Sequence, residues 1–183
     1  ASGIPAARGW RLDPRHADTF AFKDRVLRMF SEQLGILGWA PEHVAPGALP
    51  LVPERVTIKR ITNALTNAVF FVGYDAASLP APPTVLLRVY GAGSEALLSR
   101  RAELLILHTL SSLYEIGPHI LGTFANGRVE EFYECYSIGQ EGMRDLGTPR
   151  AEGPAHWVAR RMREMHEVPL DVMRTILEPV SYT

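Results

Sequence analysis

The sequence predicts an α+β fold in which an antiparallel sheet of five short strands is flanked by helices. Two observations lead to this prediction. Apolar residues alternate at a period of two in five stretches bounded by turn residues, and they recur at helical spacing in three other stretches. The order along the chain is helix, three strands, helix, two strands, helix. This order favours a layered arrangement in which helices pack on one sheet.

The N-terminal part contains one predicted helix and a connector. The first dozen residues read as a tail, and Asp18 is the expected N-cap of a helix over residues 19–37. Phe22 and Val26 are among the apolar residues on its inner face. The stretch 41–53 carries four of the 14 prolines and is therefore expected to be a connector.

The middle of the chain contains three predicted strands and a second helix. The strands cover residues 56–61, 69–74 and 84–90, and short polar turns join them into a meander. Leucines then return at helical spacing as far as Tyr114, with Ser94 as the expected N-cap.

The C-terminal part adds a hairpin and a last helix. Residues 119–124 and 128–133 alternate around Asn126-Gly127, a dipeptide typical of tight hairpin turns. A helix is expected over residues 154–166. We therefore divide the chain into an extension with one helix (1–53), a sheet domain (54–136), and a linker with a helix (137–183).

Composition excludes several classes of function. The 183 residues are 46% hydrophobic and carry a formal net charge of −1, so nothing indicates a nucleic acid partner. No apolar run reaches the length of a membrane span, and the N-terminus has no signal pattern. Cys135 is the single cysteine, which fits a reducing, cytoplasmic location. The six histidines show no metal-ligand spacing, so no metal ligands are expected here.

Three stretches of this sequence resemble choline/ethanolamine kinases. Residues 60–70 (RITNALTNAVF) are similar to the family's phosphate loop, and residues 85–91 (LLRVYG within VLLRVYG) to its arginine-containing strand. Residues 116–132 (IGPHILGTFANGRVEEF) are similar to its hairpin. The resemblance runs from about residue 12 to residue 169, is to fungal-type choline kinases, and implies a protein-kinase-like N-terminal lobe with a C-type helix. It also implies that the sheet domain binds ATP.

The resemblance gives Arg88 and Glu103 a joint role in nucleotide binding. Arg88 interrupts an apolar strand, and an unpaired buried charge there is unfavourable, so it faces solvent or has a partner. The resemblance implies a clamp on the ATP phosphates, which a guanidinium matches with two parallel hydrogen bonds. Glu103, on the following helix, is the expected acid that holds Arg88 in place. The alternative readings are two solvated surface residues.

Two further sets of residues are expected to contact ATP. The turn before the second strand would cover the phosphates with backbone N–H groups, although a plain polar hairpin turn is the alternative reading. The family usually has a glycine where this chain has Asn63. The residues of this turn are Asn63, Ala64, Leu65, Thr66 and Asn67. The strand end would offer backbone groups to the adenine edge, through Glu131, Phe132 and Tyr133.

The resemblance also indicates which parts of the reaction this chain does not carry. The family's base aspartate and Mg²⁺ ligands come from a C-terminal lobe, and no corresponding motif follows His166. We therefore expect no catalytic residue here, no activity of the chain alone, and choline or ethanolamine as partners only with that lobe. Self-association through the exposed lobe interface is expected.

Two other functions compete with this interpretation. One is another small-molecule kinase, of the aminoglycoside phosphotransferase type. The other is a shortened, non-catalytic interaction module. In the first interpretation, the parent enzyme would transfer a phosphoryl group from Mg-ATP to an amino alcohol in phospholipid biosynthesis.

Overall fold

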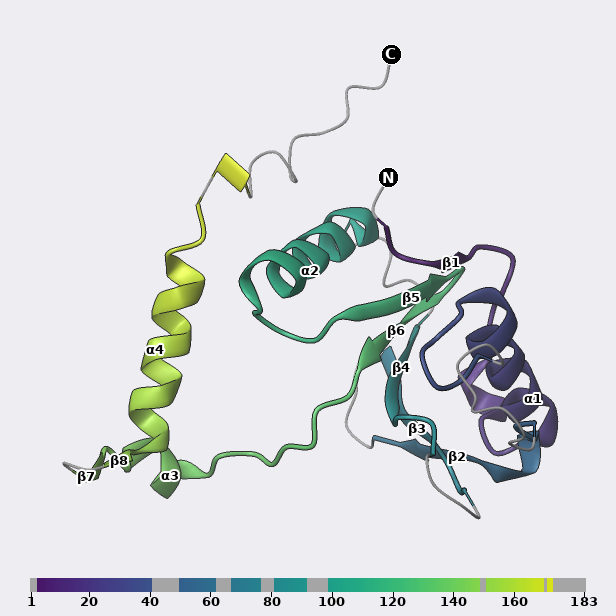
Figure 1. Ribbon diagram of the computed structural model, residues 1–183, viewed down its shortest axis with the longest axis horizontal. Helices are drawn as coiled ribbons and strands as arrows, with labels where there is room; N and C mark the ends of the chain where they lie inside the picture. The colour runs from purple at the N-terminus through teal and green to yellow at the C-terminus, as the bar shows by residue number, and fades with distance from the viewer. Residues whose placement is uncertain are drawn as a thin grey trace.

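The computed structural model describes residues 3–40, 50–61, 67–76, 81–91, 99–148, 151–169 and 171–172. It is an α+β structure built around one six-stranded sheet, with the strand order β1-β5-β6-β4-β3-β2 (Figure 1). The strands are β1 (Ala6–Ala7), β2 (Val56–Arg60), β3 (Asn67–Tyr74), β4 (Val85–Tyr90), β5 (Ile120–Phe124) and β6 (Gly127–Glu131). The five predicted strands are all present and pair antiparallel with one another, and β1 is additional.

The N-terminal segment corrects the prediction of a tail. Strand β1 pairs in parallel with β5, and Ala7 is aligned with Phe124. Leu12 is buried, and its backbone N–H and C=O both bond to the side chain of Asn126, at 3.0 and 2.8 Å. The segment is therefore an edge of the fold. A strand of two residues is too short to show a period of two, which is why the sequence does not predict it.

The first helix is shorter than predicted and is capped one residue later. Helix α1 (Phe20–Arg28) begins after Thr19, whose hydroxyl accepts a hydrogen bond from the Phe22 N–H, so Asp18 is not the N-cap. A π-helical turn, Met29–Gln33, continues it. Gly35 then adopts a φ of 57°, a left-handed conformation that ends helical structure well before residue 37.

One face of the sheet packs against α1 and forms the core. Alternate residues of the inner strands point to this face, as Val85, Leu87 and Val89 do on β4. Phe70 of β3 contacts Phe22 of α1, with ring centroids 6.1 Å apart. Because the period of a strand is two, the residues between them, including Arg88, belong to the opposite face.

Helix α2 (Arg100–Tyr114) lies over that opposite face and is only loosely packed. Its N-cap is Ser99, whose hydroxyl accepts from the Ala102 N–H, whereas the predicted cap Ser94 lies outside the described residues. Ser111 is the one residue of α2 that is buried. The helix ends at Glu115, which adopts a left-handed φ of 54°.

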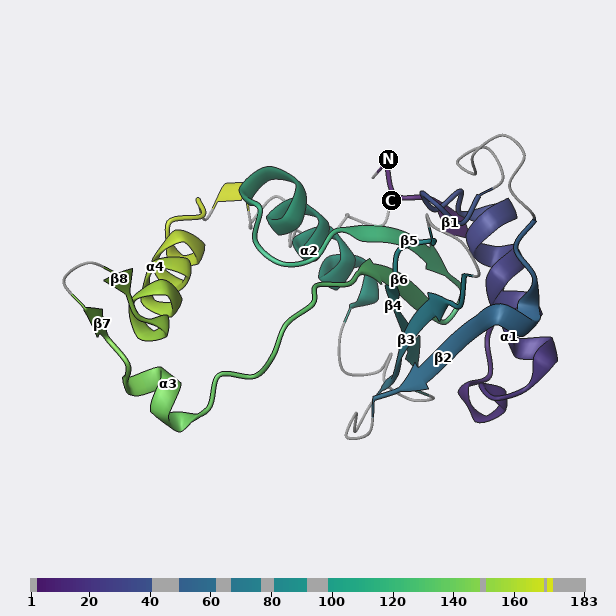
Figure 2. The same ribbon diagram turned by 60° about the horizontal axis from the view of Figure 1, so that its bottom comes forward.

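The C-terminal part extends away from the sheet. An extended stretch leads from β6 to helix α3 (Gln140–Arg144), the short hairpin of β7 (Gly147–Thr148) and β8 (Ala151–Glu152), and helix α4 (Pro154–His166) (Figures 1 and 2). The predicted last helix is confirmed. Arg161 of α4 donates to the backbone oxygen of Glu115 at 2.7 Å. Across the described residues, none of the helices has both the length and the apolar character of a membrane span.

Candidate functional site

Arg88 lies on the inner strand β4, on the face that α2 partly covers. The register places it between Val69 of β3 and Arg128 of β6. Its Nε donates to Glu130 Oε1 at 3.1 Å, and 27% of its side chain is exposed. Among the described residues, no hydrogen bond engages the two terminal nitrogens of Arg88. The guanidinium is thus anchored at one end and open at the other.

Four charged side chains continue from Arg88 to helix α2. Glu130 Oε1 also accepts from Arg128 Nε at 2.5 Å. Arg128 Nη1 donates to Glu103 Oε1 at 2.9 Å, and Glu103 Oε2 accepts from Arg100 at 2.8 Å. Opposite charges therefore alternate along the path from β4 through β6 to α2.

The structure corrects the partner that the sequence predicts for Arg88. Glu103 pairs with Arg128 and Arg100, and Arg88 pairs with Glu130. The physical reason is the register, because Glu130 and Arg128 are two residues apart on β6 and therefore share the face of Arg88. The nearest carboxylate to Arg88 comes from the neighbouring strand.

The two charges in the middle of this path are deeply buried. Arg128 is 5% exposed and Glu130 is 4% exposed. Burial alone would lower the pKa of Arg128, but the charge of Glu130 and the contacts with Tyr90 and Glu103 outweigh it and raise that pKa above its ordinary value. Buried charges of this kind are stable only when paired and hydrogen-bonded.

Glu103 stays ionised at the outer end of the path. Partial burial would raise the pKa of its carboxyl group, but hydrogen bonds from Arg100 and Arg128, together with their charges, hold that pKa below its usual range. Arg100 also stacks over the ring of Tyr90, with its guanidinium carbon 4.1 Å from the ring centroid. The Tyr90 hydroxyl accepts from Arg128 at 3.0 Å within the sheet. Helix α2 therefore contacts the sheet twice here, through Glu103 on Arg128 and through Arg100 on Tyr90.

The same face of the sheet becomes apolar toward the predicted hinge. Phe71 of β3 meets Phe132, with ring centroids 4.9 Å apart. Glu131 is the last residue of β6, and its carboxylate accepts from the Tyr133 hydroxyl at 3.0 Å. Burial, together with that bond, raises the pKa of Tyr133. The face therefore has an aromatic end and a cationic end.

Most of the predicted phosphate loop lies outside the described residues. This applies to Asn63, Ala64, Leu65 and Thr66. Asn67 is described, and it is the first residue of β3, aligned with Tyr90. Its side-chain oxygen is buried and has no hydrogen-bond partner in the part of the chain that the structure describes. Asn67 therefore lies on the face of the sheet that carries Arg88.

Sequence reasoning missed Arg128, Glu130 and Tyr90. A signal for two of them is present, because charges two residues apart in an alternating strand must share one face. Residue 129 between them is a valine that is fully buried on the α1 side, which places Arg128 and Glu130 on the opposite side. No comparable signal predicts that both would be buried.

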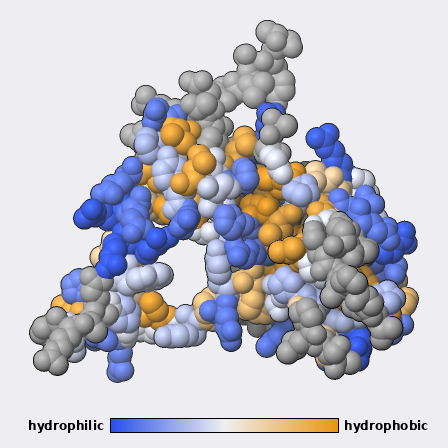
Figure 3. Space-filling view, in the orientation of Figure 1, coloured by the Kyte–Doolittle hydropathy of each residue, from blue (hydrophilic) through white to orange (hydrophobic). Residues whose placement is uncertain are grey.

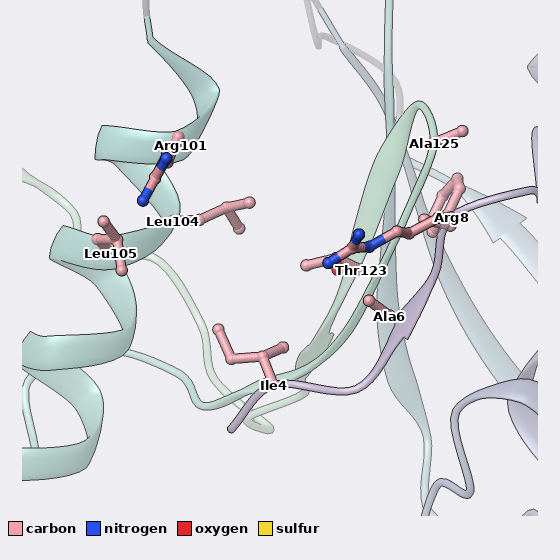
Figure 4. A pocket seen from close by; sticks show the side chains of 9 residues that line it. Ile4, Ala6, Arg8, Arg101, Leu104, Leu105, Thr123 and Ala125 are labelled. Carbon is pink, nitrogen blue, oxygen red and sulfur yellow. The ribbon is translucent and has the colours of Figure 1, made fainter. Parts of the chain in front are cut away.

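A cavity separates α2 from the edge of the sheet. A cavity of about 780 Å³ lies between α2 on one side and β1 and β5 on the other. Leu104 and Arg8 point into it from opposite walls (Figure 4), and apolar surface gathers where α2 faces the sheet (Figure 3). Ile4 and Phe124 also line it. At this place the space between helix α2 and the sheet is therefore not filled by packed apolar side chains.

Metal binding has no dedicated site in the described structure. Within the residues placed by the structure, no three His, Cys, Asp or Glu side chains are grouped so that they could hold a metal ion.

Five antiparallel strands with one helix after the third of them, and an anchored arginine on that third strand, define a protein-kinase-like small lobe. The family model for choline/ethanolamine kinase matches residues 58–180. The chain belongs to this family, and the resemblance seen in its motifs is confirmed.

Curated relatives match over most of this chain but over a minor part of their own length. A choline kinase of Schizosaccharomyces pombe is 34% identical over 162 residues, which are 86% of this chain and 31% of that protein. An ethanolamine kinase of Saccharomyces cerevisiae is 28% identical over 94% of this chain and 30% of its own length. The chain thus spans about a third of the length of these relatives.

Solved structures overlap with part of the chain. An ethanolamine kinase of Plasmodium vivax is 21% identical with a TM-score of 0.49, covering 68% of this chain and 31% of that one. A choline kinase of Cryptosporidium parvum is 23% identical with a TM-score of 0.47, covering 66% of this chain and 29% of that one.

Proposed function

We propose that this chain is the ATP-binding lobe of a choline/ethanolamine kinase, with Arg88 as its phosphate-binding residue. The observation that carries the proposal is the state of the Arg88 guanidinium. Glu130 holds its Nε at 3.1 Å, whereas no described residue bonds to its terminal nitrogens. These nitrogens are spaced to match two oxygens of a phosphate group.

The change from aromatic to cationic side chains across the sheet face supports a placement for the rest of the nucleotide. The aromatic pair of Phe71 and Phe132 suits the adenine ring, and the backbone of residues 131–133 would pair with its polar edge. The triphosphate would then run along β4 toward Arg88. Residues 63–67 would cover the phosphates, and Glu103 would act on the site through other side chains rather than touch the nucleotide.

The parent enzyme, in this proposal, transfers the γ-phosphoryl group of Mg-ATP to the hydroxyl of choline or ethanolamine. Such a transfer needs a base for the hydroxyl and acidic ligands for Mg²⁺. We assign both to the part of the relatives that this chain does not span. The 183 residues alone are then expected to bind ATP weakly and to transfer no phosphate.

The proposal is tested by titrating the ¹⁵N-labelled chain with Mg-ATP and with adenosine, while the Nε–H signals of its arginines are followed by NMR. Mg-ATP should shift the Arg88 signal, and Arg88→Met should weaken Mg-ATP binding about tenfold or more, because a charged hydrogen-bonded contact is worth ~1.5–3 kcal/mol. Adenosine binding should not change. Arg28→Met, an exposed site on α1, is the matched control.

Two results would contradict the proposal. The first is an Arg88 signal that ignores Mg-ATP while other arginines respond. The second is phosphorylation of choline by these 183 residues, which would place the catalytic groups in this chain. Extending the coding sequence past Thr183 should add a His-x-Asp-x-x-x-x-Asn segment, and a longer chain containing it should phosphorylate choline or ethanolamine.

A further inference from the structure

We propose that Arg128 and Glu130 are positioning residues that connect the phosphate-binding arginine to helix α2. The path runs from Arg88 to Glu130, then to Arg128, and from there to Glu103 on the helix. This inference rests on the proposed function for the role of Arg88. The path itself rests on the hydrogen-bond distances among buried or half-buried groups.

Glu130 is needed because the sheet places two arginines opposite each other. Arg88 and Arg128 are register partners on β4 and β6, and like charges in such a pair repel. Glu130 Oε1 accepts from the Nε of both, at 3.1 and 2.5 Å. Without its negative charge, two guanidiniums would share a face where Glu130 itself is 4% exposed. The two terminal nitrogens of Arg88 would then no longer be held in a fixed orientation.

Arg128 is the part of the path that reaches the helix. Its Nε bonds to Glu130, while its Nη1 donates both to the Tyr90 hydroxyl at 3.0 Å and to Glu103 at 2.9 Å. The guanidinium is planar and rigid, so its contacts cannot shift independently. A displacement of Glu103 is therefore passed to the group that holds Glu130.

Because α2 packs loosely against the sheet, this polar connection is important for holding the helix in position. The cavity of about 780 Å³ beside Leu104 and Phe124 leaves the helix without a filled apolar interface there. Glu103 and Arg100 lie in the first turn of α2, and both contact side chains of the sheet. The position of that first turn and the direction of Arg88 should thus vary together.

The experiment uses Glu103→Gln, since Glu103 does not touch Arg88 and its side chain is 28% exposed, so the variant should fold. The free protein is examined first. Glu103→Gln should shift or broaden the Arg88 Nε–H signal across the intervening side chains. Glu130→Gln, if folded, should shift it more. Glu32→Gln, which removes the exposed surface pair with Arg28 on α1, should leave it unchanged.

Nucleotide binding separates positioning from general stability. Glu103→Gln should weaken Mg-ATP binding several-fold and leave adenosine binding unchanged. Arg128→Lys should behave like Arg128→Met, because one ammonium cannot reproduce the three contacts of the guanidinium. An Arg88 signal and a Kd for Mg-ATP that are both unchanged in Glu103→Gln and Arg128→Lys would overturn the inference.

The same data distinguish this inference from the proposed function. If the Arg88 signal responds to Glu103→Gln but not to Mg-ATP, the side-chain connection exists and the phosphate role of Arg88 is wrong. That outcome overturns the positioning role. If Mg-ATP shifts Arg88 in every variant with one Kd, the proposed function stands and the connection is wrong.

Discussion

Single residues decide how closely β4 and β6 approach. Gly127 begins β6, and an added Cβ would lie 2.2 Å from the Arg88 backbone oxygen and 2.2 Å from the Phe124 ring. Real Cβ atoms do not come this close to backbone, so the strands would have to separate. The close contact between β4, which carries Arg88, and the hairpin of β5 and β6 therefore depends on the absence of a side chain at residue 127.

We expect Gly127→Ala to destabilise the fold by about 2 kcal/mol or more, since overpacking against backbone forces strand shifts. Urea unfolding followed by circular dichroism measures the change. Gly139→Ala is the matched control, because nothing lies within 4 Å of a Cβ at that position. Equal midpoints for the two variants would show that the strands accommodate the methyl group.

The ionisation of Glu103 gives a second prediction for a single residue. Its folded-state pKa lies below the ordinary value of 4.5, so its charge stabilises the fold fully above that value. This stabilisation is lost as the pH falls through the folded-state pKa. Between about pH 6 and pH 3, the melting temperature of Glu103→Gln should fall less than that of the unmodified chain.

The control for this pH dependence is Glu54→Gln, which alters an exposed carboxylate in the short 3-10 turn just before β2. It should keep the pH profile of the unmodified chain. Parallel profiles for Glu103→Gln and the unmodified chain would show that the pairs with Arg100 and Arg128 do not stabilise the folded state.

The family resemblance predicted Arg88 and Glu103 as site residues but not how they are connected. A charge within an apolar strand is visible in the sequence, and so is an acid on the next helix. Which carboxylate reaches Arg88 depends on the register of β4 against β6, a long-range property that local patterns do not contain. The prediction was therefore wrong about the partner, while the nucleotide roles remain predictions.

At the scale of elements, the five antiparallel strands and the last helix could be predicted from the sequence, because each is long enough to show the apolar period of its structure. The π-helical turn after α1 and the two-residue β1 were not, since neither has a distinct period. Contacts far apart in sequence hold the N-terminal segment. Asn126 bonds to both backbone groups of Leu12, 114 residues away.

This contact predicts that Asn126→Ala destabilises the fold by about 1–3 kcal/mol, because it leaves the Leu12 N–H and C=O unpaired in a buried place. Urea unfolding measures the cost. The matched comparison is the same substitution in a chain that lacks residues 1–12, where the cost should largely disappear. A similar cost in both backgrounds would mean that Asn126 acts within its own hairpin turn.

At the scale of the whole molecule, the sheet with α1 is packed while α4 stands apart from it (Figure 1). Helix α4 carries a stripe of large apolar side chains that the fold leaves exposed. Trp157, Met162 and Met165 are 55%, 55% and 53% exposed. Apolar residues at this spacing form one face, and such faces mark surfaces that associate.

We expect the chain to self-associate through this face of α4, with an average mass that rises with concentration up to the order of 100 μM. The variant Met162→Glu/Met165→Glu should lower that mass toward 20.3 kDa in light scattering. Leu37→Glu is the control, because Leu37 is 70% exposed but lies far along the chain near α1. If Leu37→Glu dissociates the assembly as well as the α4 variant, association is a general consequence of exposed apolar surface. If neither does, the stripe of α4 is not the contact.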